Sequence, residues 1–326
     1  MRLKASLASA IARLAAESVP SPRLNAELLL MFTLGCDRAY LFAHPERELN
    51  SDELARYEAA LAERARGVPA QYITGHQEFW GMDLIVTPAV LIPRPETEHV
   101  IETVLSLAAG ETAGGQECPP HMCPPHTRPP HTRIVDVGTG SGAIALALAQ
   151  EFPDAEVYAT DVSAAALEVA RANAARHQLE KRIRFHQGDL LEGLALTGLD
   201  FVVSNPPYVG EEEEDQVQFE VRKFEPREAV FGGATGVEVI TRLLPQAYSA
   251  LRPGGWLVME ISGTIASAVQ HLLATSNDAW EGVEVIPDLQ SIPRVVRARK
   301  LDRTAKSLDH GAHGKSRRKR NLRSPS

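Results

Sequence analysis

Short apolar segments and helical segments alternate along the chain from residue 133 onward, and this alternation limits the fold more than any other feature. A strand, a helix and another strand in succession favour parallel pairing, because a parallel strand needs a long crossover connection. The pattern therefore predicts an α/β fold, with a doubly wound sheet and helices on both faces. The expected strands are 133–137, 156–160, 182–186, 200–204 and 255–261, and the expected helices are 143–151, 164–176 and 236–251.

The last two apolar segments depart from this alternation. Residues 283–286 and 294–299 are separated only by a short loop that contains proline. So short a connection favours an antiparallel hairpin at the edge of the sheet. A mostly parallel sheet with an antiparallel edge hairpin is the Rossmann-like architecture of class I methyltransferases, which we expect over 99–302.

A glycine-rich loop, Asp-Val-Gly-Thr-Gly-Ser-Gly at 136–142, follows the first strand and opens the first helix. Glycine lets the backbone turn sharply and pass close to a ligand at this edge of the sheet. The spacing Gly-x-Gly-x-Gly differs from the Gly-x-Gly-x-x-Gly of dinucleotide-binding folds. It favours S-adenosylmethionine, and no acid–base group for hydride transfer supports the dehydrogenase alternative. The predicted cofactor-binding residues of the loop are Gly138, Thr139, Gly140, Ser141 and Gly142.

Acidic residues close the next two strands. Asp161 ends the second strand, where a carboxylate can accept hydrogen bonds from two ribose hydroxyls. Asp189 and Leu190 follow the third strand, beside the expected place of an adenine. We therefore expect these residues to complete the cofactor site.

Asn205, Pro206, Pro207 and Tyr208 follow the fourth strand at the same edge. An amide or exocyclic amino nitrogen is a poor nucleophile because its lone pair is delocalised, so a methylating site must orient it. The Asn205 side-chain oxygen and the Pro206 carbonyl can accept hydrogen bonds from such a nitrogen, and Tyr208 offers a ring face. The motif predicts N-methylation of a planar nitrogen, with these four residues catalytic and Asn205 also bordering the cofactor. It leaves adenine, cytosine, guanine and glutamine open as substrates.

Residues 1–75 are predicted to form a separate helical domain, either for substrate recognition or as a structural cap. Helical periodicity extends over 23–30 and over 51–66. Ser51 is a plausible N-cap of the second of these helices.

Between the two domains, residues 79–91 are extended and predict a short hairpin, within a linker assigned to 76–98. A helix begins at the end of this linker. Either Thr97 caps that helix, or Pro95 occupies its first turn.

The composition bears on whether the protein binds nucleic acid or membranes and on the compartment in which it is expected. The net charge of −8 and the acidic run at 211–215 disfavour a stable nucleic-acid partner. No apolar run approaches the roughly 20 residues that span a membrane, and three cysteines fit a reducing compartment. We expect a cytoplasmic protein without a membrane partner.

Two segments differ in composition from the rest. Residues 110–132 repeat Pro-Pro-His and are predicted to be a disordered insertion. Their cysteines and histidines could hold a metal, but a tandem repeat produces such spacings by itself, so no metal site is predicted. The basic residues 303–326 are predicted to be a disordered tail.

Taken together, the motifs resemble those of the release-factor glutamine N5-methyltransferases. The resemblance spans about residues 5 to 300 and includes Ile-Pro-Arg-Pro-Glu-Thr-Glu at 92–98, Asn-Pro-Pro-Tyr at 205–208 and Phe-Glu-Pro-Arg at 224–227. It implies that the glycine loop and Asp161 bind S-adenosyl-L-methionine. It also implies that the N-terminal domain docks peptide chain release factors, and that the Asn-Pro-Pro-Tyr residues hold the glutamine of their Gly-Gly-Gln motif. Some members carry Trp where this chain has Leu190, which suggests an aliphatic contact to adenine.

Two other functions are compatible with these motifs. Asn-Pro-Pro-Tyr also occurs in rRNA and DNA amino-methyltransferases, so a nucleic-acid methyltransferase is the main alternative, although the acidic charge disfavours it. A non-catalytic binding protein with the same fold is the other alternative, and the intact motif disfavours it.

Overall fold

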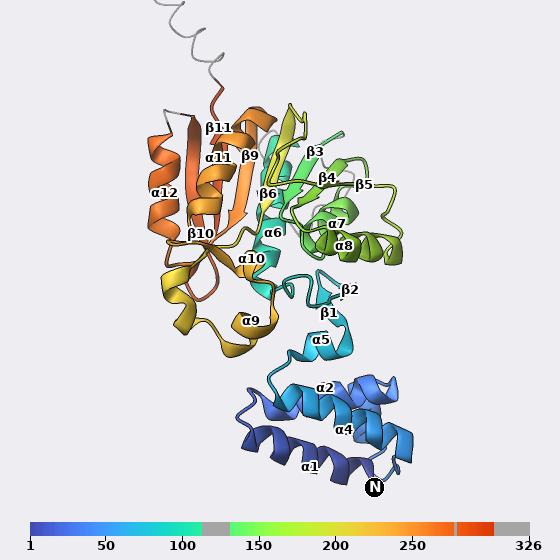
Figure 1. Cartoon of the computed structure of the whole chain (residues 1–326). Helices are drawn as coiled ribbons and strands as arrows, with labels where there is room; N and C mark the ends of the chain where they lie inside the picture. The colour runs from blue at the N-terminus through green and yellow to red at the C-terminus, as the bar shows by residue number, and fades with distance from the viewer. Residues whose placement is uncertain (113–130, 277–278, 303–326) are drawn as a thin grey trace, which may run out of the picture.

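The structure, a computed structural model, describes residues 1–112, 131–276 and 279–302. A group of N-terminal helices and a larger α/β body are connected through a short helix and a hairpin (Figure 1). Most of the predicted insertion, 113–130, and the predicted tail, 303–326, lie outside the described residues, as do the cysteines and histidines considered for a metal except His131. The prediction of disorder is wrong at both ends of the insertion, because residues 110–112 are helical and Thr132 is buried. Within the described ranges, no helix is long and apolar enough to cross a membrane.

The N-terminal helices pack their apolar faces on one another. Leu14, Leu29 and Tyr57 come from three different helices and are fully buried. The Tyr57 hydroxyl donates to the Ala26 carbonyl at 2.9 Å, so its polar atom is satisfied within the core. The helices are α1 (Leu3–Ala16), α2 (Pro22–Leu34), α3 (Arg38–Ala43), α4 (Ser51–Ala65) and α5 (Ala70–Thr74).

The N-cap of α4 is Asn50, so the prediction of Ser51 is wrong by one residue. Asn50 Oδ1 accepts a hydrogen bond from the Glu53 backbone N at 2.8 Å, and the Glu53 carboxylate accepts one from the Asn50 backbone N at 3.0 Å. This reciprocal capping box needs Glu three residues after the cap, and that spacing selects Asn50.

A seven-stranded sheet in the order β10-β11-β9-β6-β3-β4-β5 forms the α/β body. The five strands from β9 to β5 run parallel, and β10 and β11 add an antiparallel hairpin at one edge. The predicted Rossmann-like sheet is confirmed. Its strands are β3 (Arg133–Val137), β4 (Glu156–Asp161), β5 (Ile183–Gln187), β6 (Leu199–Ser204), β9 (Leu251–Glu260), β10 (Trp280–Pro287) and β11 (Pro293–Lys300).

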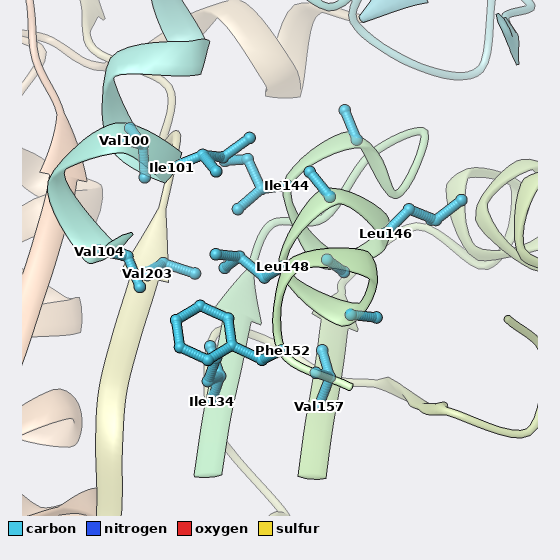
Figure 2. Close-up of a cluster of buried hydrophobic side chains, with 14 of the residues drawn as sticks. Val100, Ile101, Val104, Ile134, Ile144, Leu146, Leu148, Phe152, Val157 and Val203 are labelled. Carbon is cyan, nitrogen blue, oxygen red and sulfur yellow. The ribbon is translucent and has the colours of Figure 1, made fainter. Parts of the chain in front are cut away.

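Helices cover both faces of this sheet. Because successive side chains of a strand point to opposite faces, Ile134 packs with α6 and α7, whereas Val135 packs with α11 and α12. Figure 2 shows the first cluster, in which Val104 and Leu148 of the two helices lie on either side of Val203, and the Phe152 ring lies next to Ile134. The helices of the body are α6 (Glu98–Thr112), α7 (Ala143–Glu151), α8 (Ala164–Arg176), α11 (Glu238–Ala250) and α12 (Ala266–Thr275).

The predicted hairpin is present, but it lies closer to the N-terminus than residues 79–91. Trp80 and Gly81 adopt positive φ and make the turn. Asn173 of α8 accepts a hydrogen bond from the Ile85 backbone N at 2.7 Å and donates to the Ile85 carbonyl at 2.9 Å, and so fixes the second strand to the body. The strands are β1 (His76–Phe79) and β2 (Met82–Ile85).

Several short elements flank the carboxyl ends of the parallel strands. Pro95 begins a 3-10 helix as its first residue, as one of the two predicted alternatives has it. After β6, the chain forms a short strand, β7, and then three short helical segments. It continues into β8, which pairs with β7 in parallel. These elements are η1 (Pro95–Thr97), β7 (Val209–Gly210), η3 (Glu211–Gln216), α9 (Phe219–Phe224), α10 (Arg227–Val230) and β8 (Phe231–Gly233).

Candidate active site

A cavity of about 360 Å³ lies at the carboxyl ends of β3, β4, β5 and β6. The predicted residues that line it are Gly138, Thr139, Gly140, Ser141, Asp161, Asp189, Leu190, Asn205 and Pro207. Gly142, Pro206 and Tyr208 are next to lining residues in the chain but do not line the cavity themselves. The fold thus brings four separate strand ends to one place.

Hydrogen bonds to β4 and to the buried Asp136 carboxylate fix the conformation of the glycine loop. Gly138 and Thr139 both donate their backbone N–H groups to the Thr160 carbonyl at 2.9 Å, which ties the loop to β4. Asp136 Oδ2 accepts hydrogen bonds from the Thr139 hydroxyl at 2.6 Å and from the Ala145 backbone N at 3.1 Å. Asp136 is buried and does not line the cavity, so its role here is to join the loop to the start of α7.

Gly142 ends the loop at a φ of +86°, and it is the N-cap of α7. A Cβ at this position would lie 2.5 Å from Leu146 and 3.3 Å from the Cβ of Ala170. Glycine is therefore favoured first by the positive φ, and also by the close approach of Ala170 of α8.

Asp161 borders the cavity at the end of β4. Its Oδ2 accepts a hydrogen bond from the Gly140 backbone N and its Oδ1 accepts one from the Ser163 backbone N, both at 2.9 Å. Burial raises the pKa of Asp161, and these two hydrogen bonds act against the rise. Each carboxylate oxygen has a second lone pair, so both can still accept a hydroxyl from a ligand.

Asp189 and Leu190 lie at the end of β5. The Asp189 carboxylate forms an ion pair with Arg242 of α11 at 2.6 Å, and Arg242 also lines the cavity. Leu190 adopts a φ of +58°, which is uncommon for a residue with a side chain. Its side chain packs partly against the cluster beneath α11, so the wall is apolar at this point.

The Asn205 side chain is held by a chain of hydrogen bonds that the sequence reasoning missed. Asn205 Nδ2 donates to Thr97 Oγ1 at 3.1 Å, and Thr97 Oγ1 donates to Glu260 Oε2 at 2.6 Å. The Tyr208 hydroxyl donates to the other oxygen, Glu260 Oε1, at 3.3 Å. Thr97 is therefore a buried partner of the site, and its predicted role as a helix cap is wrong. Glu260 ends β9 at the same edge as Asp161, so the rule that revealed Asp161 could have revealed it as well.

Glu225 joins two motifs that are far apart in the chain. Its buried carboxylate accepts a hydrogen bond from the Ile92 backbone N at 3.2 Å and forms an ion pair with Arg94. The neighbouring Pro226 lines the cavity on one side of this contact, and Pro93 lines it on the other. The segments 92–98 and 224–227 consequently form one wall.

This sheet and this arrangement of loops define a class I methyltransferase. Residues 5–75 match the family model described as PrmC N-terminal domain, and residues 124–222 match the Methyltransferase small domain. The hMettl16 catalytic domain, solved in complex with MAT2A 3'UTR hairpin 6, shares the fold with a TM-score of 0.50 at 16% identity, covering 75% of this chain and 83% of that one.

Curated relatives narrow the class to a family. A Release factor glutamine methyltransferase of Koribacter versatilis is 52% identical over 301 residues, which cover 92% of this chain and 99% of the relative. One of Moorella thermoacetica is 44% identical over 288 residues, covering 88% and 95%. The chain belongs to the release factor glutamine methyltransferase family.

Proposed function

We propose that this enzyme transfers a methyl group from S-adenosyl-L-methionine to the N5 side-chain amide of the glutamine in the Gly-Gly-Gln motif of peptide chain release factors. The observation that carries the proposal is the orientation of Asn205 at the cavity wall. Its Nδ2 is engaged by Thr97, which leaves its Oδ1 to accept a hydrogen bond from a substrate N–H.

The cavity is suited to S-adenosylmethionine in shape and charge. The Asp161 carboxylate retains lone pairs for ribose hydroxyls, and Leu190 offers an apolar surface to a base. Asp161, Asp189 and Glu228 all line the cavity, and carboxylates favour a cationic sulfonium ligand. The bound cofactor supplies an electrophilic methyl group.

The residues of the chain orient the glutamine amide. Asn205 Oδ1 and the Pro206 carbonyl are the two acceptors that we assign to its N–H groups, and Pro207 removes a competing backbone donor. No strong base is required before transfer, because the amide protons become acidic only as the nitrogen becomes cationic. Positioning is therefore the main contribution of the protein, and it can supply about 7–11 kcal/mol of a barrier.

We assign residues 1–75 to recognition of the release factor, 76–98 to the linker and 99–302 to the methyltransferase domain. The helices of the first segment carry exposed apolar side chains, among them Leu24, Phe32 and Phe42. Such side chains are typical of surfaces that bind another protein.

The experiment is incubation with methyl-labelled S-adenosylmethionine and a purified release factor, followed by mass spectrometric localisation of the label. We expect labelling of a release factor with Gly-Gly-Gln, and none with Gly-Gly-Ala, with DNA or with ribosomal RNA. Label in the Gly-Gly-Ala protein or preferential label in nucleic acid would refute the glutamine assignment.

Two variants separate cofactor binding from transfer. Asp161→Ala should weaken S-adenosylmethionine binding by roughly 1.5–3 kcal/mol for each hydrogen bond lost by the carboxylate. Asn205→Ala should keep that affinity within a few fold while transfer falls by orders of magnitude. Titration calorimetry and single-turnover rates measure the two effects independently.

A further inference from the structure

Glu260 is a buried carboxylate whose position no ligand contact in the proposed reaction explains. It is 2% exposed at the end of β9, and it does not line the cavity. Both of its oxygens accept hydrogen bonds, from the Thr97 hydroxyl at 2.6 Å and from the Tyr208 hydroxyl at 3.3 Å. Burial of a carboxylate is unfavourable, so its presence here needs a compensating role.

An ionised carboxylate sets the direction of the whole hydrogen-bond chain, because it can only accept. Glu260 therefore requires Thr97 to donate toward it. The Thr97 oxygen is then left to accept from Asn205, which turns the amide nitrogen of Asn205 toward Thr97 and its oxygen away. Without this constraint, an asparagine amide could rotate and present its N–H₂ group to the cavity, where an amide substrate also presents N–H groups.

We propose that Glu260 and Thr97 are positioning residues for methyl transfer, which act by fixing the direction of the Asn205 amide and the place of the Tyr208 hydroxyl. The inference rests on the proposed function, since it concerns the same amide substrate. It assigns a role to Thr97 within the motif at 92–98 and to an acid on β9, outside the motifs considered above.

The first test removes the Thr97 hydroxyl and keeps the shape of the side chain. Thr97→Val should lower the single-turnover rate of methyl transfer about 100-fold, the size expected for a misplaced reacting group, with S-adenosylmethionine affinity within twofold. Thr97→Ser retains the hydroxyl and should recover most of the rate. Thr103→Val is the matched control, because the Thr103 hydroxyl is buried as well but donates only to the His99 carbonyl.

The second test changes Glu260 to a residue that can donate. Glu260→Gln offers Thr97 either an oxygen or an N–H₂ group, so the direction of the chain is no longer fixed. We expect a rate loss of the same size as in Thr97→Val, and a double variant little worse than either single one, because the two residues act as one unit. Multiplied losses, or wild-type rates in both single variants, would overturn the proposal.

The pH dependence distinguishes a positioning role from a purely structural one. Burial raises the pKa of Glu260 to about 7; Thr97, Tyr208 and nearby Arg294 act against the rise, and Glu96 adds to it. Protonated Glu260 can donate and reverse the chain, so the rate at saturating S-adenosylmethionine should fall as the pH falls through about 7. Glu260→Gln should lack this acidic limb, and an unchanged limb in that variant would contradict the inference.

A substrate-independent measurement keeps this inference separate from the proposed function. The side-chain NH₂ signal of Asn205 can be assigned in ¹⁵N spectra by its loss in Asn205→Asp. We expect slowed exchange with solvent in the wild type and faster exchange in Thr97→Val, whether or not a release factor is methylated. Equal exchange in the two proteins would refute the hydrogen-bond chain, whereas absent labelling by the wild type would refute the proposed function alone.

Discussion

At the scale of single residues, Asp136 holds the glycine loop in place although the burial of its carboxylate is unfavourable. Its carboxylate is 1% exposed, and Oδ1 has no hydrogen-bond partner among the described residues. Burial raises the pKa of Asp136 to about 7, and the hydrogen bonds from Thr139 and Ala145 act against the rise. The folded protein thus binds this proton more tightly than the unfolded chain does.

The consequence is a pH-dependent contribution to stability. Because the pKa is raised from 3.8 to about 7 on folding, the free energy of unfolding contributed by Asp136 falls as the pH rises from about 4 to 7. Asp136→Asn cannot lose this proton, so its stability relative to the wild type should increase between pH 5 and pH 8, by up to roughly 3 kcal/mol, because about two thirds of the pKa rise from 3.8 to about 7 lies in this range.

Denaturant unfolding of both proteins at the two pH values measures this difference. Asp154→Asn, at an exposed position, gives the baseline. A stability difference between Asp136→Asn and the wild type that stays constant with pH would contradict the expected ionisation.

The site residues that could be predicted from the sequence are those that directly follow a parallel strand. Asp161 and Asn205 follow from the rule that parallel strands present their carboxyl ends at one edge. Thr97 could not be predicted, because its contact with Glu260 joins residues 163 positions apart and has no local pattern. The ion pair of Asp189 with Arg242 was missed for the same reason.

At the scale of elements, the backbone of β8 packs directly against the backbone of the Asn-Pro-Pro-Tyr loop. A Cβ at Gly232 would meet the carbonyl oxygens of Pro207 and Gly236, at distances shorter than real Cβ contacts. Both neighbours are backbone atoms, so the added atom could be accommodated only by a shift of the loop itself. The glycine is thus required by the close approach of two backbones.

Gly232→Ala should therefore reduce methyl transfer about 100-fold, the effect of a displacement near 1 Å at a reacting group. S-adenosylmethionine affinity should change much less, because the glycine loop lies on another strand. Gly110→Ala, where the added Cβ meets nothing within 4 Å, is the control. A Gly232→Ala enzyme with wild-type single-turnover rates would show that the loop does not need this support.

Several long elements were predicted closely and the shortest were not, although α12 was also missed and β9 begins four residues before the predicted strand. α7 and α8 begin and end at the predicted residues, because the continuous apolar run of α7 after the glycine loop and the Ser163 cap of α8 are local signals. β7 and β8 contain only two and three residues, and their pairing brings Val209 next to Phe231. Strands so short carry no periodicity, and tertiary contacts decide them.

At the scale of the whole molecule, Arg64 connects the N-terminal helices to the α/β body. Its side chain is 4% exposed and forms an ion pair with Glu220 of α9 at 2.5 Å. It also donates to Asn25 Oδ1 at 2.7 Å and to the Val68 carbonyl at 3.2 Å. Next to this contact, the ring of Phe219 fills the space beside Gly67. α9 is therefore held from the side of the helical domain.

Arg64→Met keeps the aliphatic length but leaves Glu220 and Asn25 without their partner. We expect a loss of about 2 kcal/mol in the free energy of unfolding, which is less than for a fully buried pair because Glu220 is partly exposed, and a higher KM for the release factor. Arg13→Met, in an exposed pair with Glu58, should cost under about 1 kcal/mol. Equal losses in the two variants would show that the Arg64–Glu220 ion pair contributes no more to stability than an exposed pair does.

The antiparallel direction of β11 has a practical consequence. Its first residues pair with the end of β9 near Glu260, and its last residues pair with the first half of β9. β11 therefore ends at the edge of the sheet opposite to the carboxyl ends of the parallel strands, where the cavity lies, and away from the N-terminal helices (Figure 1). An enzyme immobilised on a sensor surface through this end would present its substrate-facing side to solution. Association and dissociation of release factors could then be timed directly, with the attachment point away from the binding side.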